Sequence, residues 1–278
     1  MPNPFPVQIP ESTRADDAEL ARALKRVTWR LAPWLMLMYV VSFLDRANIG
    51  FAKQALAGTE GITERAYALA AGLFFIGYSS CGFPSNLVLH RVGAKIWIGI
   101  LMVCWGLVSM ATMFVTGSTS FYALRLLLGV TEAGFFPGMV FYLTLWFPRR
   151  VRGRMLGLFY LGVPLALIIG GPLSGFLLDL RLPVGLQGWQ VMFLVEGAMA
   201  AALGLFAFWF LHDKPAHASW IPESEKRALE AQLAREESER RAAGPAKLLT
   251  MLSDGRVFGF LGVYALIQMS TYGAVFYL

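Results

Sequence analysis

Charged residues are scarce in this 278-residue sequence, where they make up 15% of the chain, whereas 56% of the residues are hydrophobic. A soluble domain has about a quarter of its residues charged, and the mean hydropathy here is positive, at 0.56. This balance excludes an ordinary water-soluble domain and indicates that lipid is the solvent. We therefore expect a protein whose main partner is the lipid bilayer.

Cysteines and catalytic motifs are also scarce. Cys81 and Cys104 are the only cysteines, and both lie in apolar runs, so we expect neither a disulfide framework nor a metal site. The sequence has no nucleotide-binding loop, zinc-ligand spacing or nucleophile elbow, so an enzyme and a cofactor are not expected. The net charge of +6 comes from basic residues in short links between apolar runs, and a nucleic-acid partner is therefore not expected either.

Long apolar runs dominate what is present. Each is long enough to cross about 30 Å of hydrocarbon as a helix, so the fold class is predicted to be all-α and membrane-spanning. The seven predicted spans are 31–52, 66–89, 96–116, 121–146, 154–178, 190–211 and 257–278.

Four segments follow from these spans. We expect a cytoplasmic start at 1–28, a six-helix transmembrane bundle at 29–211, a cytoplasmic central loop at 212–255 and a seventh transmembrane helix at 256–278. The start contains prolines and then a short amphipathic helix from Asp16 to Val27. No cleavable signal peptide is visible, so the first span is expected to direct insertion.

Lysine and arginine are concentrated in alternate links, which predicts the orientation of the chain. The positive-inside rule places the N-terminus and the central loop in the cytoplasm. The basic links carry Lys25, Arg26 and Arg30 before the first span, Arg91 and Lys95 after the second, and Arg149, Arg150, Arg152 and Arg154 after the fourth. The links after spans one, three and five are poorer, with Lys53 and Arg65, then none, then Arg181.

The central loop is predicted to contain a solvated helix that begins at Pro222 and ends at Gly244-Pro245. Acid-first pairs four residues apart favour this helix. The pairs are Glu223 with Arg227, Glu236 with Arg240, and Glu237 with Arg241. A partner-binding helix is the alternative.

Charges inside the apolar runs are the strongest functional signal. Asp45 and Arg46 lie side by side in the first span, in FLDRANIGFA (residues 43–52). A charge deep in a bilayer costs several kcal/mol, so it is kept only if it is paired, hydrated or needed. A structural ion pair between the two is one reading, and a proton or substrate-anion site is the one we favour.

The fourth span carries a second acid and a second base. Arg125 and Glu132 are seven residues apart, so they share one face of a helix, with Gly129 between them leaving room for a helix or a ligand. Pro137, flanked by glycines, predicts a kink. The alternative for Arg125 is a structural anchor near the outer interface. Together with the first pair, these residues suit proton-coupled uptake of an anion, because arginine holds carboxylates and an unpaired acid can take up a proton.

Weaker features have structural readings. Gly153 with Gly157, and Gly171 with Gly175 in the segment GGPLSG (residues 170–175), have the spacing of close helix contacts. Tyr78 can face a pore or anchor an interface. Glu196 opens the sixth span and is expected at the membrane interface.

Four motifs resemble the anion:cation symporter family of the major facilitator superfamily. They are FLDRANIGFA, GYSSCGFPSNLVLHRVGAKIW (77–97), RLLLGVTEAGFFPG (125–138) and DKPAHASWIPESEK (213–226). Within that family, the PSNL stretch resembles the phthalate, tartrate and hydroxyphenylacetate permease branch, and LSDGRVF (252–258) resembles the start of the seventh helix. The resemblance runs from Trp29 to the last residue.

The resemblance implies two six-helix bundles that rock around a central cavity, in a bacterial inner membrane. It implies that Asp45 and Glu132 couple protons, that Arg46 pairs with Asp45 and binds the substrate carboxylate, and that Arg125 and Tyr78 support the site. It also implies a cytoplasmic gate at Arg91, Lys95 and Arg152. In the superfamily's inter-helix motif an aspartate is common where this sequence has His90, as this branch often allows, so the usual acidic contact of that gate is not expected here.

The function expected from these observations is proton-driven symport of a small organic anion, tartrate-like or aromatic, with protons as the second partner. A drug-type antiporter, suggested by GGPLSG, and a non-transporting membrane protein are the alternatives. Family members have twelve spans and this chain has seven. We therefore expect the 278 residues alone not to transport, and to pair with a second half or with another copy.

Overall fold

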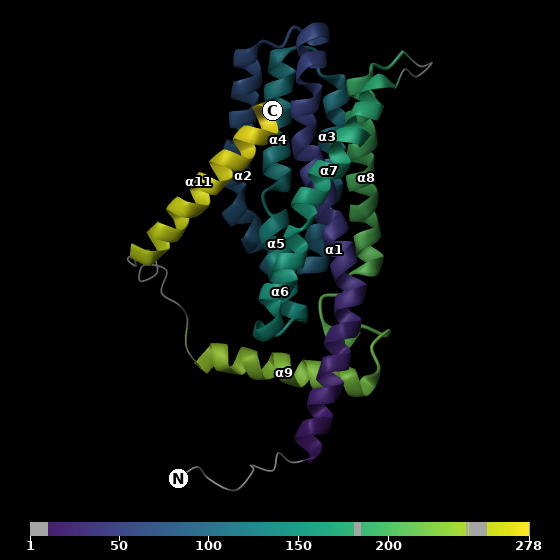
Figure 1. Ribbon diagram of the computed structural model, residues 1–278, viewed down its shortest axis with the longest axis vertical. Coiled ribbons are helices and arrows are strands. Elements are labelled where there is room, and N and C mark those ends of the chain that lie inside the picture. The colour runs from purple at the N-terminus through teal and green to yellow at the C-terminus, as the bar shows by residue number, and fades with distance from the viewer. Residues whose placement is uncertain (1–10, 181–184, 243, 245–254, 278) are drawn as a thin grey trace.

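The computed structural model describes residues 11–180, 185–242, 244 and 255–277, and every element in these ranges is a helix (Figure 1). The all-α prediction is therefore confirmed. The α-helices are α1 (Glu11–Glu60), α2 (Glu64–Val92), α3 (Ala94–Ala111), α4 (Ser118–Glu132), α5 (Phe135–Trp146), α6 (Arg149–Tyr160), α7 (Gly162–Asp179), α8 (Gly188–Phe210), α9 (Glu223–Ala242) and α11 (Gly255–Tyr277). Two 3₁₀ turns, η1 (Thr112–Phe114) and η2 (Pro215–His217), complete the described elements.

Six helical stretches in the described residues are long and apolar enough to cross a membrane, and they coincide with the first six predicted spans. Two of them are composite, because α4 with α5 and α6 with α7 each form one stretch. The seventh predicted span coincides with α11, a helix of 23 residues. Its crossing of the membrane stays a prediction, as does the division of the chain into four segments.

The first helix is longer than predicted. A separate amphipathic helix at Asp16–Val27 was expected, but α1 runs for 50 residues without a break and carries Pro33 inside it. The physical reason is a single buried stripe at helical spacing that continues across the expected boundary. Its residues are Ala23, Val27, Leu31, Leu35 and Met38, each at most 2% exposed.

Glycines set how closely the helices of the bundle approach one another. A Cβ atom at Gly129 would lie 2.0 Å from the carbonyl oxygen of Phe74, so α4 meets the backbone of α2 there. A Cβ at Gly106 of α3 would likewise lie 2.6 Å from the carbonyl oxygen of Gly197 in α8. The space at Gly129 is therefore used by a neighbouring helix, one of its two predicted uses.

The predicted helix contacts at the paired glycines of α6 and α7 are wrong for the described chain. A Cβ atom at Gly153, Gly157, Gly171 or Gly175 would meet no described atom within 4 Å. The spacing of small residues makes a flat helix face, but it carries no information on whether another helix covers that face.

The predicted kink in the fourth span is confirmed and lies just before Pro137. Helix α4 ends at Glu132 and α5 begins at Phe135, so Pro137 is in the first turn of α5, where its missing N–H is not needed. At the break, a Cβ on Gly134 would lie 1.7 Å from the hydroxyl oxygen of Ser85 in α2. The break therefore places Glu132 at the end of a helix, next to α2.

The predicted helix of the central loop is confirmed as α9, which lies across the same end of the molecule as the start of α1 (Figure 1). It is not solvated on all sides, because Glu225 and Leu229 are buried. Of its three predicted ion pairs, the structure forms Glu237–Arg241, at 3.0 Å. The expectations for the first ten residues, Arg181 and Pro245 lie outside the described residues.

Candidate functional site

Asp45 and Arg46 lie in the middle of α1, and both are buried, at 0% and 6% exposure. Neighbouring residues on a helix point about 100° apart, so the two side chains reach different helices. Arg46 Nε donates to Glu132 Oε2 of α4 at 2.6 Å. Asp45 Oδ1 accepts a hydrogen bond from the Ser109 hydroxyl of α3. The expected Asp45–Arg46 pairing is therefore replaced by an ion pair between α1 and α4.

Arg125 and Glu132 are both buried on α4, at 3% and 0% exposure, which agrees with the shared face predicted from their spacing. Arg125 is therefore enclosed by protein rather than placed at the surface of the bundle. Among the described residues no carboxylate lies within ion-pair distance of Arg125, and its Nε has no hydrogen-bond partner. Asp45 and Glu132 are the carboxylates that act on it electrostatically.

Aromatic rings surround the buried arginines. The guanidinium carbon of Arg46 lies 5.1 Å from the ring centroid of Tyr78 and 5.5 Å from that of Phe43. The Phe74 ring is shared, because the guanidinium carbons of Arg46 and Arg125 each lie 5.9 Å from its centroid. Contacts of this kind stabilise a desolvated cation by up to about 2 kcal/mol, so aromatic side chains replace part of the water that the arginines have lost.

A cavity of about 790 Å³ opens beside this cluster, between the bundle and α11. Among the described residues that line it, Arg46 is the only charged one. The predicted residue Tyr78 also lines the cavity, whereas Arg125, Asp45 and Glu132 do not. Most of the other lining side chains on the bundle are aromatic, namely Tyr39, Phe43, Phe75, Phe136 and Tyr160. The cavity therefore presents one cation in an aromatic wall, with the acids behind it.

The gate predicted at Arg91, Lys95 and Arg152 stays a prediction, and the structure gives the individual surroundings of these residues. Arg91 is exposed at the end of α2, and the backbone N–H of Lys95 donates to Asp213 Oδ1 at 2.8 Å. Arg152 donates twice to the carbonyl oxygen of Phe147, at 3.3 and 3.0 Å. His90, which stands where an aspartate is common in the superfamily's motif, packs against the Phe141 ring. Asp213 supplies an acid at the start of α3 instead.

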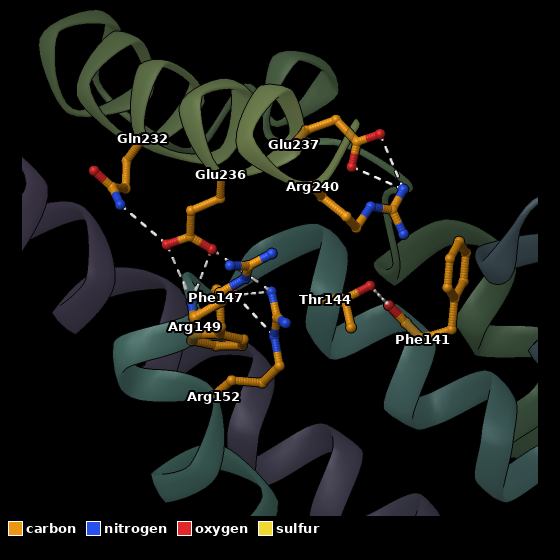
Figure 2. Close-up of polar contacts among 9 residues, drawn as sticks. All are labelled: Phe141, Thr144, Phe147, Arg149, Arg152, Gln232, Glu236, Glu237 and Arg240. Atoms are coloured by element: carbon orange, nitrogen blue, oxygen red, sulfur yellow. Dashed lines mark hydrogen bonds and ion pairs between the residues drawn. The ribbon is translucent and has the colours of Figure 1, made fainter. Parts of the chain in front are cut away.

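Figure 2 shows that α9 is attached to the start of α6 through Glu236. The two carboxylate oxygens of Glu236 accept hydrogen bonds from the backbone N–H of Arg149, at 3.2 and 2.9 Å. The side chain of Gln232 donates to Glu236 at 3.0 Å, and Arg152 lies 3.9 Å away. A carboxylate at a helix N-terminus is favourable because the free N–H groups there carry partial positive charge.

A second contact attaches α9 to α1. Arg26 Nε and Nη2 donate to the two carboxylate oxygens of Glu225, at 2.9 and 3.1 Å. The hydrogen bond from Arg26 holds the pKa of Glu225 below its usual value. The two contacts show that α9 is part of the bundle's base rather than a free linker.

Sequence reasoning did not predict the contacts of four polar residues, namely Ser109, Asp213, Glu196 and Glu236. Glu236 was assigned to Arg240 on its own helix, and Asp213 to no contact. Serine in a helix commonly bonds its own backbone, so Ser109 gave no signal. Glu196 is 1% exposed inside α8, so it is enclosed by the bundle, and its predicted position at the membrane interface stays a prediction. The signal available was its position among small residues that permit close packing, Gly197, Ala200 and Gly204.

Metal binding has no support in the described part of the chain, where no three His, Cys, Asp or Glu residues are grouped to hold an ion. The cysteines Cys81 and Cys104 are both free. The groups that the described site offers are carboxyl, guanidinium and hydroxyl groups, which form the ion pair and hydrogen bonds given above.

Comparison with known proteins gives a family. Residues 35–278 match the Major Facilitator Superfamily. Over 244 residues the chain is 44% identical to a protein of Agrobacterium vitis named "Putative tartrate transporter", covering 88% of this chain and 54% of that protein. It is 42% identical over 261 residues to the inner membrane transport protein RhmT of Escherichia coli, covering 94% of this chain and 60% of RhmT.

A third relative is named for a different substrate. The chain is 41% identical over 250 residues to a quinolone resistance transporter of Acinetobacter baumannii, covering 90% of this chain and 58% of that protein. Among solved structures, a bacterial homologue of the human lysosomal transporter Spinster matches with a TM-score of 0.60 at 20% identity, over 66% of this chain and 44% of the homologue. That likeness shows the fold. The chain spans about half the length of the curated relatives it matches.

Proposed function

Because the chain belongs to the Major Facilitator Superfamily, a family of transporters and not of enzymes, we propose that it forms the first half of a proton-coupled symporter for a small organic anion. The protein is a multi-pass membrane protein, and the E. coli relative is named for the inner membrane, so we place this one in a bacterial inner membrane. In this proposal the second half is another six-helix bundle or a second copy of the chain.

The observation that carries the proposal is the Arg46–Glu132 ion pair at the wall of the cavity. Arg46 is the lining residue that offers positive charge, and a carboxylate is the group that its planar fork fits best. One of the fork's nitrogens is already donated to Glu132 at 2.6 Å. A substrate carboxylate therefore competes with Glu132 for Arg46.

Proton coupling follows from this competition. When the substrate carboxylate takes Arg46, Glu132 is left as a buried charge without its partner, which is costly. Binding a proton removes that charge. Symport then results because the anion and the proton bind favourably only together. Asp45 is the second buried acid of the cluster and does not line the cavity. Arg125 acts on Asp45 and balances part of its negative charge.

Uptake measurements test this proposal. The chain is reconstituted in proteoliposomes together with a six-helix second half, and labelled tartrate and benzoate are supplied with and without an inward proton gradient. We expect accumulation that depends on the gradient and is abolished by Glu132→Gln, while Arg46→Lys weakens binding because the planar fork is lost. The matched control Glu237→Gln, on the exposed face of α9, leaves uptake unchanged. Accumulation by Glu132→Gln that still follows the gradient would exclude Glu132 as the coupling residue.

Drug export is a second candidate, favoured by the aromatic cavity wall and by the quinolone resistance relative. Planar drugs stack on aromatic side chains as readily as aromatic acids do. The two functions differ in the direction of the gradient-driven flux. Efflux of labelled quinolone that is driven by an inward proton gradient, with no uptake of either acid, would favour export over symport.

A further inference from the structure

A third buried acid, Glu196, lies outside the cluster of Arg46 and Glu132. It is on α8, which packs against α1, α3 and α7, and its side chain is sealed from solvent at 1% residue exposure. Glu196 Oε1 accepts a hydrogen bond from the Ser174 hydroxyl of α7 at 3.2 Å. Glu196 Oε2 has no hydrogen-bond partner in the part of the chain that the structure describes.

Glu196 differs from Glu132 in the positively charged residues nearby. Glu132 has Arg46 at 2.6 Å, whereas no lysine or arginine of the described residues lies within ion-pair distance of Glu196. An ionised carboxylate that is desolvated and held by one hydroxyl group is strongly disfavoured. A protonated carboxyl group avoids that cost and gains a donor. The surroundings of Glu196 therefore suit the acid rather than its anion.

Asn48 lies on the same helix as Asp45 and is placed against Glu196. It is fully buried on α1, three residues after Asp45 and so on the same helix face. Its amide is close enough to the Glu196 carboxyl group to act on it, but among the described residues neither amide atom has a hydrogen-bond partner. Asp45 Oδ2 is also buried without a partner among the described residues. Three unpartnered polar groups are thus placed in sequence from α8 to α1.

An amide has one acceptor and one donor group. It can therefore bridge two carboxyl groups only if one of them is protonated and gives its O–H to the amide oxygen, while the other accepts from the NH₂ group. Each acid accepts from one serine hydroxyl, Asp45 from Ser109, but the positive charge of Arg125 acts on Asp45 alone, which favours an ionised Asp45. Ser174 donates to one oxygen of Glu196, which leaves the other oxygen to carry the proton.

We propose that Glu196 is a proton-holding residue of the transport core, whose O–H donates to the Asn48 amide while that amide donates to Asp45. Glu196 is a positioning residue in this arrangement, because it acts on Asp45 through Asn48 and does not line the cavity. Its role in transport rests on the proposed function. The protonation itself is a property of the bundle and is measurable without transport.

Other charged groups face this chain of contacts and enter its pH dependence. Glu132 and Arg125 of α4 act on Asp45, and Tyr67 of α2 acts on Arg125. The elements α3 and α7 contribute the hydroxyl groups of Ser109 and Ser174. Glu196 itself acts on Asp45, so the charge state of one acid is felt by the other.

Infrared spectroscopy of the purified 278-residue chain in lipid nanodiscs tests the proposal, with protonated carboxyl groups read from their C=O stretching band. We expect a protonated-carboxyl band at neutral pH that Glu196→Gln removes. Asn48→Leu is expected to keep this band and shift it, because its acceptor is lost, and Ser174→Ala is expected to shift it as well. Glu237→Gln, on the exposed face of α9, leaves the band unchanged.

Three outcomes overturn the proposal. A spectrum of Glu196→Gln identical to that of the original chain means that Glu196 is ionised, and a band removed by Asp45→Asn but kept in Glu196→Gln places the proton on the wrong acid. A band that Asn48→Leu leaves unshifted removes the link to Asp45. Because the Asn48 and Ser174 variants keep the carboxyl group, they give an answer even if Glu196→Gln does not fold. Failure of the uptake experiment alone leaves this assignment standing.

Discussion

In the described residues, helix α1 makes Arg–Glu ion pairs with two other helices, twenty residues apart, and these two pairs lie in very different surroundings. Arg26 pairs with Glu225 of α9, with side-chain exposures of 48% and 6%. Arg46 pairs with Glu132 of α4, with exposures of 7% and 0%. At the base of the bundle water can replace Glu225 as the partner of Arg26, because Arg26 is half exposed. In the bundle interior it cannot, so each charge depends on the other. The same residue types therefore give an attachment in one place and, in the proposed function, an exchangeable ion pair in the other.

We call Arg46–Glu132 the inner pair and Arg26–Glu225 the outer pair. Removing one member of the inner pair is expected to have the largest effect on stability. Glu132→Ala leaves Arg46 as an uncompensated buried charge, and a loss of about 3–5 kcal/mol in the free energy of unfolding is expected. The matched variant of the outer pair, Glu225→Ala, is expected to lose only about 1 kcal/mol, because Arg26 is half exposed. Denaturation of the purified chain in detergent, followed by circular dichroism, measures both losses.

The double variant Arg46→Leu with Glu132→Leu sharpens this comparison. It removes both charges and keeps most of the volume, so it is expected to recover most of the stability that Glu132→Ala loses. Equal losses for Glu132→Ala and Glu225→Ala would show that burial does not separate the two pairs. A double variant as unstable as Glu132→Ala would show that the loss comes from packing rather than charge.

The inner pair also shows how far the sequence could be read. The composition of the sequence and the charges within its apolar runs correctly identified four buried residues of the bundle. These are Asp45, Arg46, Arg125 and Glu132. The spacing of Arg125 and Glu132 correctly put them on one face of α4. The pairing was wrong, because periodicity describes a residue's direction on its own helix but not which helix crosses there. Arg46 meets Glu132 across 86 residues of sequence.

The end of the molecule that carries α9 was harder to predict for the same reason. Spacing on α9 assigned Glu236 to Arg240, but the structure turns Glu236 toward the start of α6, and Arg240 pairs with Glu237 instead, at 2.8 Å. A local partner three or four residues away is always available to a helical acid, and its energy is a few tenths of a kcal/mol. Free N–H groups at a helix start compete successfully with it. The position of that start relative to α9 is set by tertiary packing.

Glu236 provides the intermediate effect. Glu236→Ala removes the acceptor of the Arg149 N–H at the start of α6 and the neighbour of Arg152 (Figure 2). Loss of such a cap costs about 1 kcal/mol, and we expect that decrease in the free energy of unfolding. Glu239→Ala is the matched control on α9, since its contact is an exposed one with Arg235 at 3.4 Å, and it is expected to change stability by less than about 0.5 kcal/mol.

Amide hydrogen exchange separates two reasons for that decrease. If Glu236 caps α6, the first N–H groups of α6 exchange faster in Glu236→Ala while the rest of the bundle keeps its protection. Uniformly faster exchange would instead indicate general destabilisation. Unchanged exchange at Arg149 would contradict the capping contact.

The smallest expected effect is a pH dependence at the outer pair. The hydrogen bond from Arg26 lowers the pKa of Glu225 from its usual value of 4.5, so the folded chain holds the ionised carboxylate more strongly than the unfolded chain does. The contribution is therefore present above about pH 4.5 and is lost as the pH falls through the folded-state pKa. Because Arg26 is half exposed, it is expected to be less than about 1 kcal/mol. Glu225→Gln, which keeps the side-chain shape, is expected to be less stable than the original chain at pH 7 and equal to it at pH 3. Unfolding of the two chains in urea across this range measures the difference. A difference that persists unchanged at pH 3 would mean that α9 is held to α1 by packing around Leu229 and not by the charge of Glu225.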